Sequence, residues 1–472
     1  MPLTTLLHLA RWLSRGRRAR LGGLLAACVV PAAMAQTTVR FATFNASLNR
    51  DAEGQLLADL AEPVSANAQD AQGRRRQQVA NVAEIIQRTS PDVLLINEFD
   101  FDAEGVPGST STPAPLGYSS RAAALFQDNY LAKPQGAARR GFAAPLNYAH
   151  RYTPPTNTGI PSGLDLDADG RLDGANDAFG FGNFPGQYGF TLYSRYPIVA
   201  VRSFQNFLWS DMPGNLLTND PAPGSNNLAR FFPAGASTVL RLSSKNHVDV
   251  TLDIGGQQVH FLMAHPTPPV FDGAEDRNGK RNHDEIRFWS DYIAGAAYPY
   301  DDQGGSGGLP TGAHFVIAGD YNADLCDGDS LRVACSAPGQ PGNGPNAIGQ
   351  LLQHPLVNVT ITPASAGGSA AARDPNNNGS ASASHVSDPK FDTADFNDSS
   401  PGNQRVDYVL PSATLTLTAA GVFWPVDADP GDDNSSGDAF DLVGQFNKPA
   451  LYAGLPSSDH KLVYVDVLVP AP

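Results

Sequence analysis

The sequence is poor in charge, in cysteine and in long apolar runs. Only 17% of its 472 residues are charged and 41% are hydrophobic, which excludes a largely disordered chain. Beyond the N-terminal segment, no apolar stretch is long enough to span a bilayer, which excludes a protein with several transmembrane helices. Glycine (46) and proline (38) are plentiful and predict many loops. The length permits one large domain or two of ordinary size.

The first 35 residues have the composition of a targeting segment. Five arginines precede an apolar stretch at 21–33, and Ala-Met-Ala at 33–35 forms a small-x-small cleavage pattern. Leu-Ala-Ala-Cys at 25–28 also fits a lipoprotein box, and Arg17-Arg18 would suit a twin-arginine signal. We favour plain cleavage after Ala35, because apolar residues continue past Cys28. The sequence therefore predicts a signal peptide (1–35) and a secreted or periplasmic protein of residues 36–472.

Removal of that segment makes an acidic chain more acidic. The formal net charge is −15, and residues 1–35 hold five arginines and no acid, so cleavage leaves −20. Tight metal-free binding to duplex nucleic acid depends on Lys and Arg that neutralise phosphates, and this balance disfavours it. A hydrolase that meets phosphate through a divalent cation is still permitted.

Two of the three cysteines, Cys326 and Cys335, lie beyond the predicted cleavage site. A close pair in an exported chain predicts one disulfide, and two unpaired thiols are the alternative. The closed loop is short, so we expect about 2–3 kcal/mol of stabilisation. The bridge would tie down the loop that follows Asp320 and Asn322.

The stretch HFVIAGDYNAD (314–324) is the first sign of catalysis. Residues 315–318 are apolar and partly β-branched, which predicts a buried strand that runs into Asp320 and Asn322. Two polar side chains two residues apart on a strand point the same way. Burial of such a pair costs several kcal/mol unless a charge or a hydrogen bond meets it.

Polar residues recur at the ends of other expected strands. Alone, each is readily a capped or solvated residue, and for Glu98 the odds of a plain surface charge are even. Together they offer oxygen ligands for a hard cation, histidines with nearby carboxylates, and an amide donor for an oxyanion. The set comprises Asn45, Glu98, His265, Asp320, Asn322, Asp407, Asp459 and His460.

Two long segments interrupt these strands. Residues 101–186 are rich in Gly, Pro, Ala and Asn and predict an insertion, and residues 363–404 are Ser/Gly-rich and predict a flexible loop. The insertion contains DLDADGRLDGAND (165–177), which we interpret as a structural calcium loop, with an acidic solvated loop as the alternative. Asn176 replaces the glutamate of an EF-hand, and no strong helix flanks the loop. Its predicted ligands are Asp165, Asp167, Asp169, Asp173 and Asp177.

The order FNAS, INEFD, LMAHPTPP, GDYNAD, RVDYVL and SSDHKLV resembles the endonuclease/exonuclease/phosphatase superfamily, which has the DNase I-like fold. The resemblance covers most of 38–470. The tract FPGQYGFTLYSRYPI resembles a secreted bacterial branch of that superfamily. The resemblance implies an α/β fold, a four-layer α-β-β-α sandwich of two mixed or antiparallel six-stranded sheets with long loop insertions. The site would lie across one end of the sandwich.

The resemblance also implies roles for the strand-end residues. It makes Glu98 the principal metal ligand, with Asn45 and Asp459 beside it. It makes Asp320 and Asn322 the pair that orients the attacking water and holds the phosphate. Asp407 would orient His460, the base or charge stabiliser, and His265 would lie near the phosphate. The acid that usually supports the second histidine is not evident in the sequence.

These assignments predict a monomeric hydrolase that uses Mg²⁺ or Mn²⁺ for in-line attack of water on phosphorus. Its phosphoester substrate is a nucleic acid in the first interpretation, which makes the protein a nuclease. A second interpretation keeps the chemistry but assigns phosphomonoesters or phospholipid and sphingolipid head groups. A third, of a different class, is a non-catalytic secreted binding protein stabilised by calcium. The paired Asp and His residues argue against the third, because a pure binder has no need of them.

Overall fold

The computed structural model describes residues 36–62, 71–101, 119–137, 141–332, 334–337, 339–340, 342, 346–373, 380–425 and 457–472. These residues belong to one unit, Gln36–Pro472. The predicted signal peptide lies outside the described residues, as do its cleavage and lipoprotein patterns. None of the described helices is long and apolar enough to cross a membrane.

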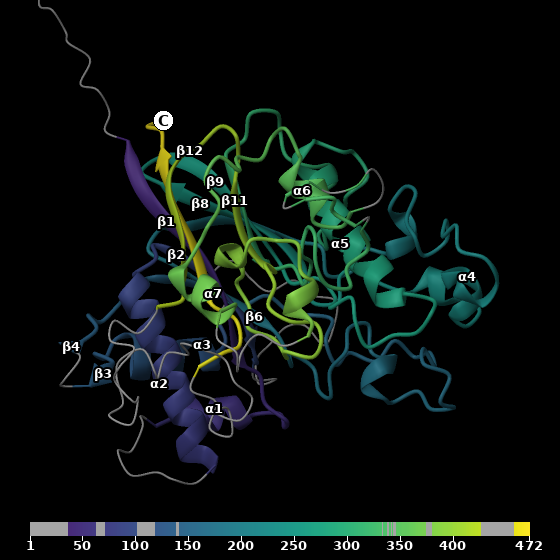
Figure 1. Cartoon of the computed structure of the whole chain (residues 1–472), viewed down its shortest axis with the longest axis horizontal. Helices are drawn as coiled ribbons and strands as arrows, with labels where there is room; N and C mark the ends of the chain where they lie inside the picture. Colours follow the sequence, from purple (N-terminus) through teal and green to yellow (C-terminus); the bar gives the residue numbers. More distant parts are fainter. Residues whose placement is uncertain are drawn as a thin grey trace, which may run out of the picture. The chain divides into compact units, whose positions relative to one another are not determined.

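The first sheet has six strands and mixed pairing (Figure 1). Its central strand β1 runs parallel to β2 and antiparallel to β13. The strand order is β12-β13-β1-β2-β6-β5. The strands are β1 (Thr37–Leu48), β2 (Val93–Phe99), β5 (His150–Tyr152), β6 (Phe190–Ser194), β12 (Thr416–Phe423) and β13 (Leu462–Val469).

The second sheet has five strands in the order β11-β10-β9-β8-β7. Strands β8 and β9 form a hairpin around Gly255 and Gly256, both at positive φ (65° and 93°), which suits glycine. Strand β10 runs parallel to β9 and antiparallel to β11. The strands are β7 (Ile198–Ser203), β8 (His247–Ile254), β9 (Gln257–Ala264), β10 (Phe315–Asp320) and β11 (Asp407–Pro411).

Apolar side chains from both sheets share one core. Phe41 on β1 stacks on Phe261 on β9 at 5.9 Å between ring centroids, and Val39, Val250 and Val316 belong to the same buried cluster. The alternation of strand side chains that sends these residues inward leaves a second apolar face outside, which helices must cover.

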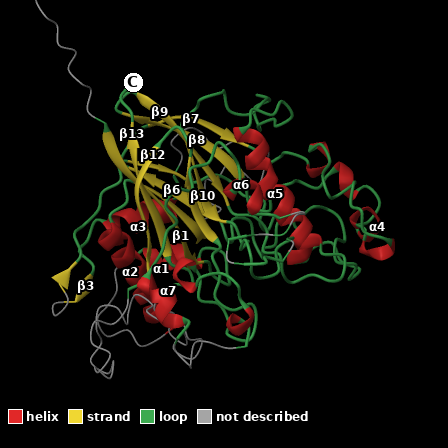
Figure 2. Cartoon of the chain, turned by 45° about the horizontal axis from the view of Figure 1, so that its top comes forward, coloured by secondary structure: helices red, strands yellow, loops and turns green. Residues whose placement is uncertain are grey.

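Helices cover the two outer faces (Figure 2). On the first sheet, α2 (Ala71–Thr89) buries Val79, Val82 and Ile86 against Phe44 and Ile96. On the second sheet, α5 (Arg277–Ile293) buries its own apolar residues against β9 and β10. The result is the expected four-layer α-β-β-α sandwich. The expectation of six strands in each sheet was wrong for the second sheet, which has five among the described residues.

The shorter elements lie mostly in the loops between strands. Within the expected insertion, α3 buries Ala122, Ala123 and Phe126, so this part packs on the first sheet. The remaining helices are α1 (Gln55–Leu60), α3 (Arg121–Phe126), the π-helix Gln127–Leu131, α4 (Leu228–Phe231), α6 (Gly349–Leu352) and α7 (Ala366–Ala371), and the hairpin β3–β4 pairs Gly136–Ala137 with Gly141–Phe142.

Candidate active site

Strand pairing brings the predicted residues to one end of the sandwich. The register of β1 and β2 pairs Asn45 with Asn97, one residue before Glu98. The register of β10 and β11 pairs Asp320 with Asp407. Carboxyl ends of parallel strands meet at one sheet edge, so β1 with β2 and β9 with β10 each deliver two site residues there.

Asp320 is the centre of the arrangement. Its Oδ2 accepts a hydrogen bond from Asn45 Nδ2 at 2.9 Å and lies 3.4 Å from His265 Nε2 and 3.7 Å from His460 Nε2. Its Oδ1 accepts the backbone N–H of Asn322 at 2.9 Å. Burial raises the pKa of Asp320 to about 6, against the opposing effect of His460. The carboxylate is therefore ionised at neutral pH.

His460 is held by Asp407. Its Nδ1 lies 2.8 Å from Asp407 Oδ2, and the ring of Phe396 packs edge-on against the imidazole at 5.2 Å. Thr393 Oγ1 donates to the same Asp407 oxygen at 2.8 Å. Burial alone would lower the pKa of His460, but the carboxylates of Asp407 and Asp320 outweigh it and raise that pKa well above the ordinary value. The imidazole is held as a cation whose Nε2–H faces Asp320.

Glu98 has the properties of a cation ligand. It is half-buried and adopts φ 52°, a left-handed conformation that is uncommon outside glycine and occurs often at functional sites. Burial raises its pKa, His460 opposes that change, and Asp459 and Asp320 add to it. Glu98, Asp459 and Asp320 thus gather negative charge around one pocket, which is an environment that a hard divalent ion would complete.

The other two predicted metal residues are placed differently. Asn45 directs its amide nitrogen at Asp320, while its Oδ1 accepts from the backbone N–H of Ser47 at 3.1 Å. Asn45 is therefore a hydrogen-bond donor in this arrangement, and its amide lowers the pKa of Glu98 against the larger effect of burial. Asp459 Oδ1 accepts a hydrogen bond from Ser47 Oγ at 3.2 Å. The charge of Asp459 also raises the pKa of Glu98.

Among the described residues, Asp320, Asp407 and His460 form one group whose ligand atoms lie within 4.8 Å of one another. His460 Nδ1 and Asp407 Oδ2 already bond each other, so this group is better suited to proton chemistry than to metal binding. The carboxylate that remains available to a cation is Glu98, with Asp459 beyond it. The residues present fit a divalent cation at Glu98.

His265 differs from His460 in the direction in which its surroundings shift its pKa. It is 2% exposed, and among the described residues no group hydrogen-bonds its Nδ1. Burial, followed by Lys245 and His460, lowers its pKa well below the ordinary value. His265 is therefore neutral. The acid that usually supports this histidine was not evident in the sequence, and among the described residues no acid hydrogen-bonds Nδ1 either.

Asn322 lies beside the site in a left-handed conformation, φ 50°. Its backbone N–H holds Asp320, and its side-chain Nδ2 donates to Pro266 O at 3.2 Å. The structure thus joins Asn322 to the segment that follows β9.

Sequence reasoning missed Lys245 and Thr267. Lys245 is 6% exposed, burial lowers its pKa, and its nearest opposite charges are Glu285, Glu98 and Asp320. Thr267 carries a buried hydroxyl that has no hydrogen-bond partner among the described residues. A lysine before a strand resembles a surface residue, so no pattern in the sequence identified it.

Glu285 of α5 holds the backbone at Thr267 and at Ser244, the residue before Lys245. Its two carboxylate oxygens accept the backbone N–H groups of Ser244 and Thr267, both at 2.6 Å. A helix on the outer face thereby fixes two loops at the site.

A cavity of about 610 Å³ opens from this end of the sandwich. Its polar end is formed by Glu98, Lys245 and Thr267. Its far wall includes Asp167 and Asn176 of the predicted calcium loop. The expected insertion therefore contributes directly to the cavity beside the candidate site.

The predicted calcium loop brings only some of its acids together. Ligand oxygens of Asp165, Asp167 and Asp177 lie within 4.8 Å of one another. Asp169 lies in the same turn, where its N–H donates to Asp165 and Asp167. Asp173 instead forms an exposed ion pair with Arg171 at 3.1 Å. The structure thus groups three of the five predicted ligands and sets Asp173 apart.

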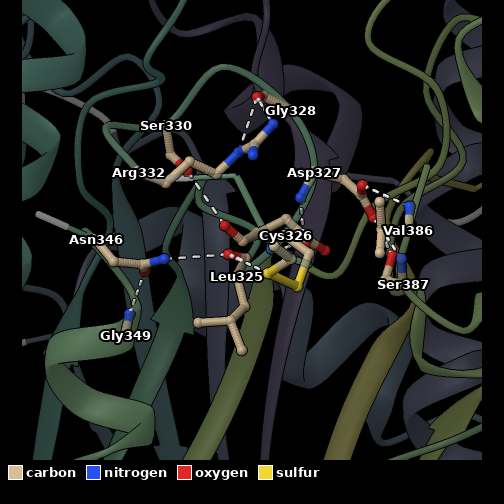
Figure 3. Close-up of a disulfide and its surroundings, with 12 residues drawn as sticks. Leu325, Cys326, Asp327, Gly328, Ser330, Arg332, Asn346, Gly349, Val386 and Ser387 are labelled. Carbon is tan, nitrogen blue, oxygen red and sulfur yellow. Dashed lines mark hydrogen bonds between the residues drawn. A yellow bond between two sulfur atoms is a disulfide. The ribbon is translucent and has the colours of Figure 1, made fainter. Parts of the chain in front are cut away.

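Cys326 and Cys335 form a disulfide, with 5.1 Å between their Cα atoms (Figure 3). Beside it, Asp327 accepts the backbone N–H groups of Val386 and Ser387 at 2.8 and 3.0 Å. The bridged loop thereby contacts the 380–405 segment. The same segment carries Thr393 and Phe396, which hold the Asp407–His460 pair.

A sequence model described as the Endonuclease/Exonuclease/phosphatase family matches residues 42–460. No curated protein sequence matches the chain.

Several solved structures are similar to it. An endonuclease/exonuclease/phosphatase from Beutenbergia cavernae is 17% identical, with 92% of this chain and 72% of that chain covered and a TM-score of 0.41. A Staphylococcus aureus beta toxin with bound magnesium ions is 13% identical, with 91% and 99% covered and a TM-score of 0.39. A mannosyl-6-phosphatase from Bacteroides thetaiotaomicron is 10% identical, with 91% and 100% covered and a TM-score of 0.39.

Proposed function

This chain belongs to the endonuclease/exonuclease/phosphatase family, and on that basis we propose that it is a divalent-metal-dependent phosphodiesterase that acts as a nuclease. The observation that carries the proposal is the position of Asp320, which meets Asn45, His265 and His460 through one oxygen. A buried carboxylate between two histidines in opposite charge states is suited to water attack on a phosphoester.

Glu98 would hold the cation, with Asp459 as a further carboxylate. A bound Mg²⁺ or Mn²⁺ would polarise a phosphoryl oxygen and stabilise the leaving oxygen. Calcium at Asp165, Asp167 and Asp177 would be structural.

The chain's own side chains supply the remaining steps. Asp320, ionised and fixed by Asn45 and the Asn322 N–H, accepts a hydrogen bond from the attacking water. His460 holds its proton at Nε2, and this charge offsets the negative charge that develops on the phosphoryl group. Neutral His265 presents Nε2 to the same space, where it can share a hydrogen bond with the phosphate.

Export belongs to the same proposal. The basic, apolar and small-residue pattern of 1–35 supports a signal peptide, and a disulfide suits an oxidising compartment. We assign the protein to the secreted bacterial branch whose tract FPGQYGFTLYSRYPI it resembles, acting as a monomer.

The test measures whether the full chain hydrolyses DNA, RNA, a phosphomonoester and sphingomyelin, and whether this hydrolysis depends on a metal ion. We expect activity on a nucleic acid that EDTA abolishes and that Mg²⁺ or Mn²⁺ restores. Glu98→Gln should lower kcat by at least about 10²-fold, the scale of an electrostatic group in the transition state.

The matched control is Glu62→Gln, because the side chain of Glu62 is 73% exposed and its one ion pair within the described part of the chain is with Arg76. It should retain wild-type activity. Full activity of Glu98→Gln would remove the metal-ligand assignment. Hydrolysis confined to the phosphomonoester or to sphingomyelin would replace the nuclease by one of the alternative substrate classes.

A further inference from the structure

The cavity beside Glu98 continues away from the catalytic groups. Its lining includes the polar residues Lys245 and Thr267 and the aromatic residues Phe181, Tyr188 and Phe271. Glu98 lines the same cavity, so a phosphoester at the catalytic groups would direct one of its substituents into this space. The inference that follows rests on the proposed phosphodiesterase function.

Two of the lining aromatic residues are held in an unusual backbone conformation. Tyr188 and Phe271 adopt φ 57° and 65°, and they are the only aromatic residues with positive φ in the described part of the chain. A bulky residue in this region is strained and persists where the fold requires it, often at ligand-binding sites. The structure therefore places these side chains at the cavity at an energetic cost.

The rings are also open to a ligand. Phe271 is 86% exposed and Phe181 is 54% exposed. Phe181 and Tyr188 have ring centroids 6.3 Å apart, which forms a continuous aromatic surface. Exposed large aromatic residues are costly in water, and planar bases stack on such surfaces.

Hydrogen-bonding groups are interspersed among the rings. Asn176 and Asn278 line the cavity and direct their amide nitrogens at Asp167 Oδ2 (2.9 Å) and Val270 O (2.6 Å). Within the described residues no hydrogen bond reaches the Oδ1 of either. Each amide oxygen is thus available to accept from an amino or imino group of a ligand.

The charges of the wall narrow the ligand class further. Three basic side chains line the cavity (Lys245, Arg277 and Arg281) and outnumber the two carboxylates that line it (Glu98 and Asp167), which favours an anionic ligand over a quaternary ammonium head group. An acyl chain would gain nothing from the amide oxygens and would leave them without a partner. A cavity of about 610 Å³ holds one small ligand and cannot admit a duplex.

We propose that this cavity binds one unstacked nucleoside of the substrate, with the base against Phe181, Tyr188 and Phe271 and the phosphate beside Lys245 and Glu98. The substrate class is accordingly a nucleoside phosphodiester or a single-stranded nucleic acid, whose bases can leave the stack without opening a duplex.

The test separates binding from activity. Calorimetry on the full chain without added metal compares uridine 5′-monophosphate with ribose 5-phosphate, two ligands that differ only in the base. We expect at least about tenfold tighter binding of the nucleotide, the scale of one base stacked on aromatic side chains. Equal affinities would overturn the proposal.

Phe271→Ala should remove most of this preference, and its control is Phe142→Ala, another exposed phenylalanine (61%) that does not line the cavity, which should keep it. Because Phe271 is 86% exposed, its truncation leaves the core intact. An unchanged preference in Phe271→Ala would overturn the placement of the base.

Two further assays distinguish other failures. Mg²⁺-dependent release of p-nitrophenol from methyl p-nitrophenyl phosphate tests the proposed function without a base, so its absence contradicts the phosphodiesterase alone. Release of phosphocholine from sphingomyelin vesicles that Phe271→Ala abolishes, together with no preference for the nucleotide, would assign the cavity to a lipid.

Discussion

At the scale of the residue, one carboxylate oxygen organises the candidate site. Asp320 Oδ2 contacts an amide and two imidazoles, and the two imidazoles are driven to opposite charge states by their surroundings. His460 has Asp407 behind it, whereas His265 has no group at Nδ1 in the described structure and has Lys245 nearby. The two histidines have identical side chains, so their different charge states follow from the groups that surround each ring.

This arrangement predicts that His460 and Asp407 act as one unit. His460→Ala should lower kcat by roughly 10²–10⁴-fold while KM changes little, because the imidazole stabilises charge that develops during the reaction. Asp407→Asn should give a smaller loss, since the imidazole stays but its proton is held less firmly. Steady-state kinetics on the two variants and on the double variant measure both effects.

The double variant is the sharper measurement. If the two residues act together, it should be scarcely worse than His460→Ala. Losses that multiply would show that they act separately, and an unimpaired His460→Ala enzyme would remove His460 from the site.

At the scale of the element, loops acquire their order from the strands and helices that they contact. Glu285 of α5 holds the backbone of Ser244 and Thr267. The disulfide-bridged loop holds the 380–405 segment through Asp327, and that segment supports Asp407 through Thr393. The Ser/Gly-rich composition of residues 363–404 predicts a flexible loop. The described residues of this range include α7 and the buried Thr393 and Ala394.

The calcium loop is predicted to behave as a local element. Removal of Ca²⁺ should loosen residues 160–180 without unfolding the sandwich, because Asp165 and Asp167 lie in a surface loop while the core strands pack elsewhere. Limited proteolysis in Mg²⁺, with either Ca²⁺ or EGTA, would map the cleavage sites.

An Asp165→Asn/Asp167→Asn variant provides the control, because its cleavage should be insensitive to Ca²⁺. Identical patterns for the wild type under both conditions would support the acidic solvated loop instead.

At the scale of the whole molecule, acid stability depends on a histidine outside the catalytic group. His247 is 1% exposed, and its two ring nitrogens bond Ser243 Oγ at 2.6 Å and Glu285 O at 2.8 Å. Burial lowers the pKa of His247 to about 4, despite the opposing effect of Glu285. The folded state therefore resists its protonation.

Because the pKa of His247 is lower in the folded state than the ordinary 6.5, acid shifts the equilibrium toward unfolding. Its contribution is complete above pH 6.5, falls as the pH drops to about 4, and is lost below that. The loss should be on the order of 3 kcal/mol in the free energy of unfolding. Denaturant titrations at several pH values, compared between the wild type and His247→Gln, isolate this contribution.

The comparison with His247→Gln is required, because other groups titrate in the same pH range and change the free energy of unfolding in the opposite direction. Burial raises the pKa of Asp100 to about 7 and that of Asp276 to about 6, so acid favours their folded forms. Parallel pH profiles for the two proteins would contradict the assignment to His247.

Much of the sandwich and of the catalytic group was predictable because both are written in local patterns. Apolar runs that end in polar residues predicted the strands that carry the site residues, which are β1, β2, β9, β10, β11 and β13. The boundaries were less predictable. Strand β2 continues through Glu98. The extent of this strand depends on its pairing with β6, and the φ of 52° at Glu98 depends on distant contacts, which a local pattern does not record.

By itself, the sequence determined the candidate residues at the strand ends and the pair of cysteines, since these depend on residue type and spacing along the chain, and its resemblance to the family implied the two-sheet architecture. Only the tertiary structure decided that Asn45 donates to Asp320, that Lys245 and Thr267 belong to the site, and that the 101–186 region lines its cavity. These residues lie in loops without periodicity. Their positions follow from hydrogen bonds and packing between segments far apart in sequence, which no local pattern records.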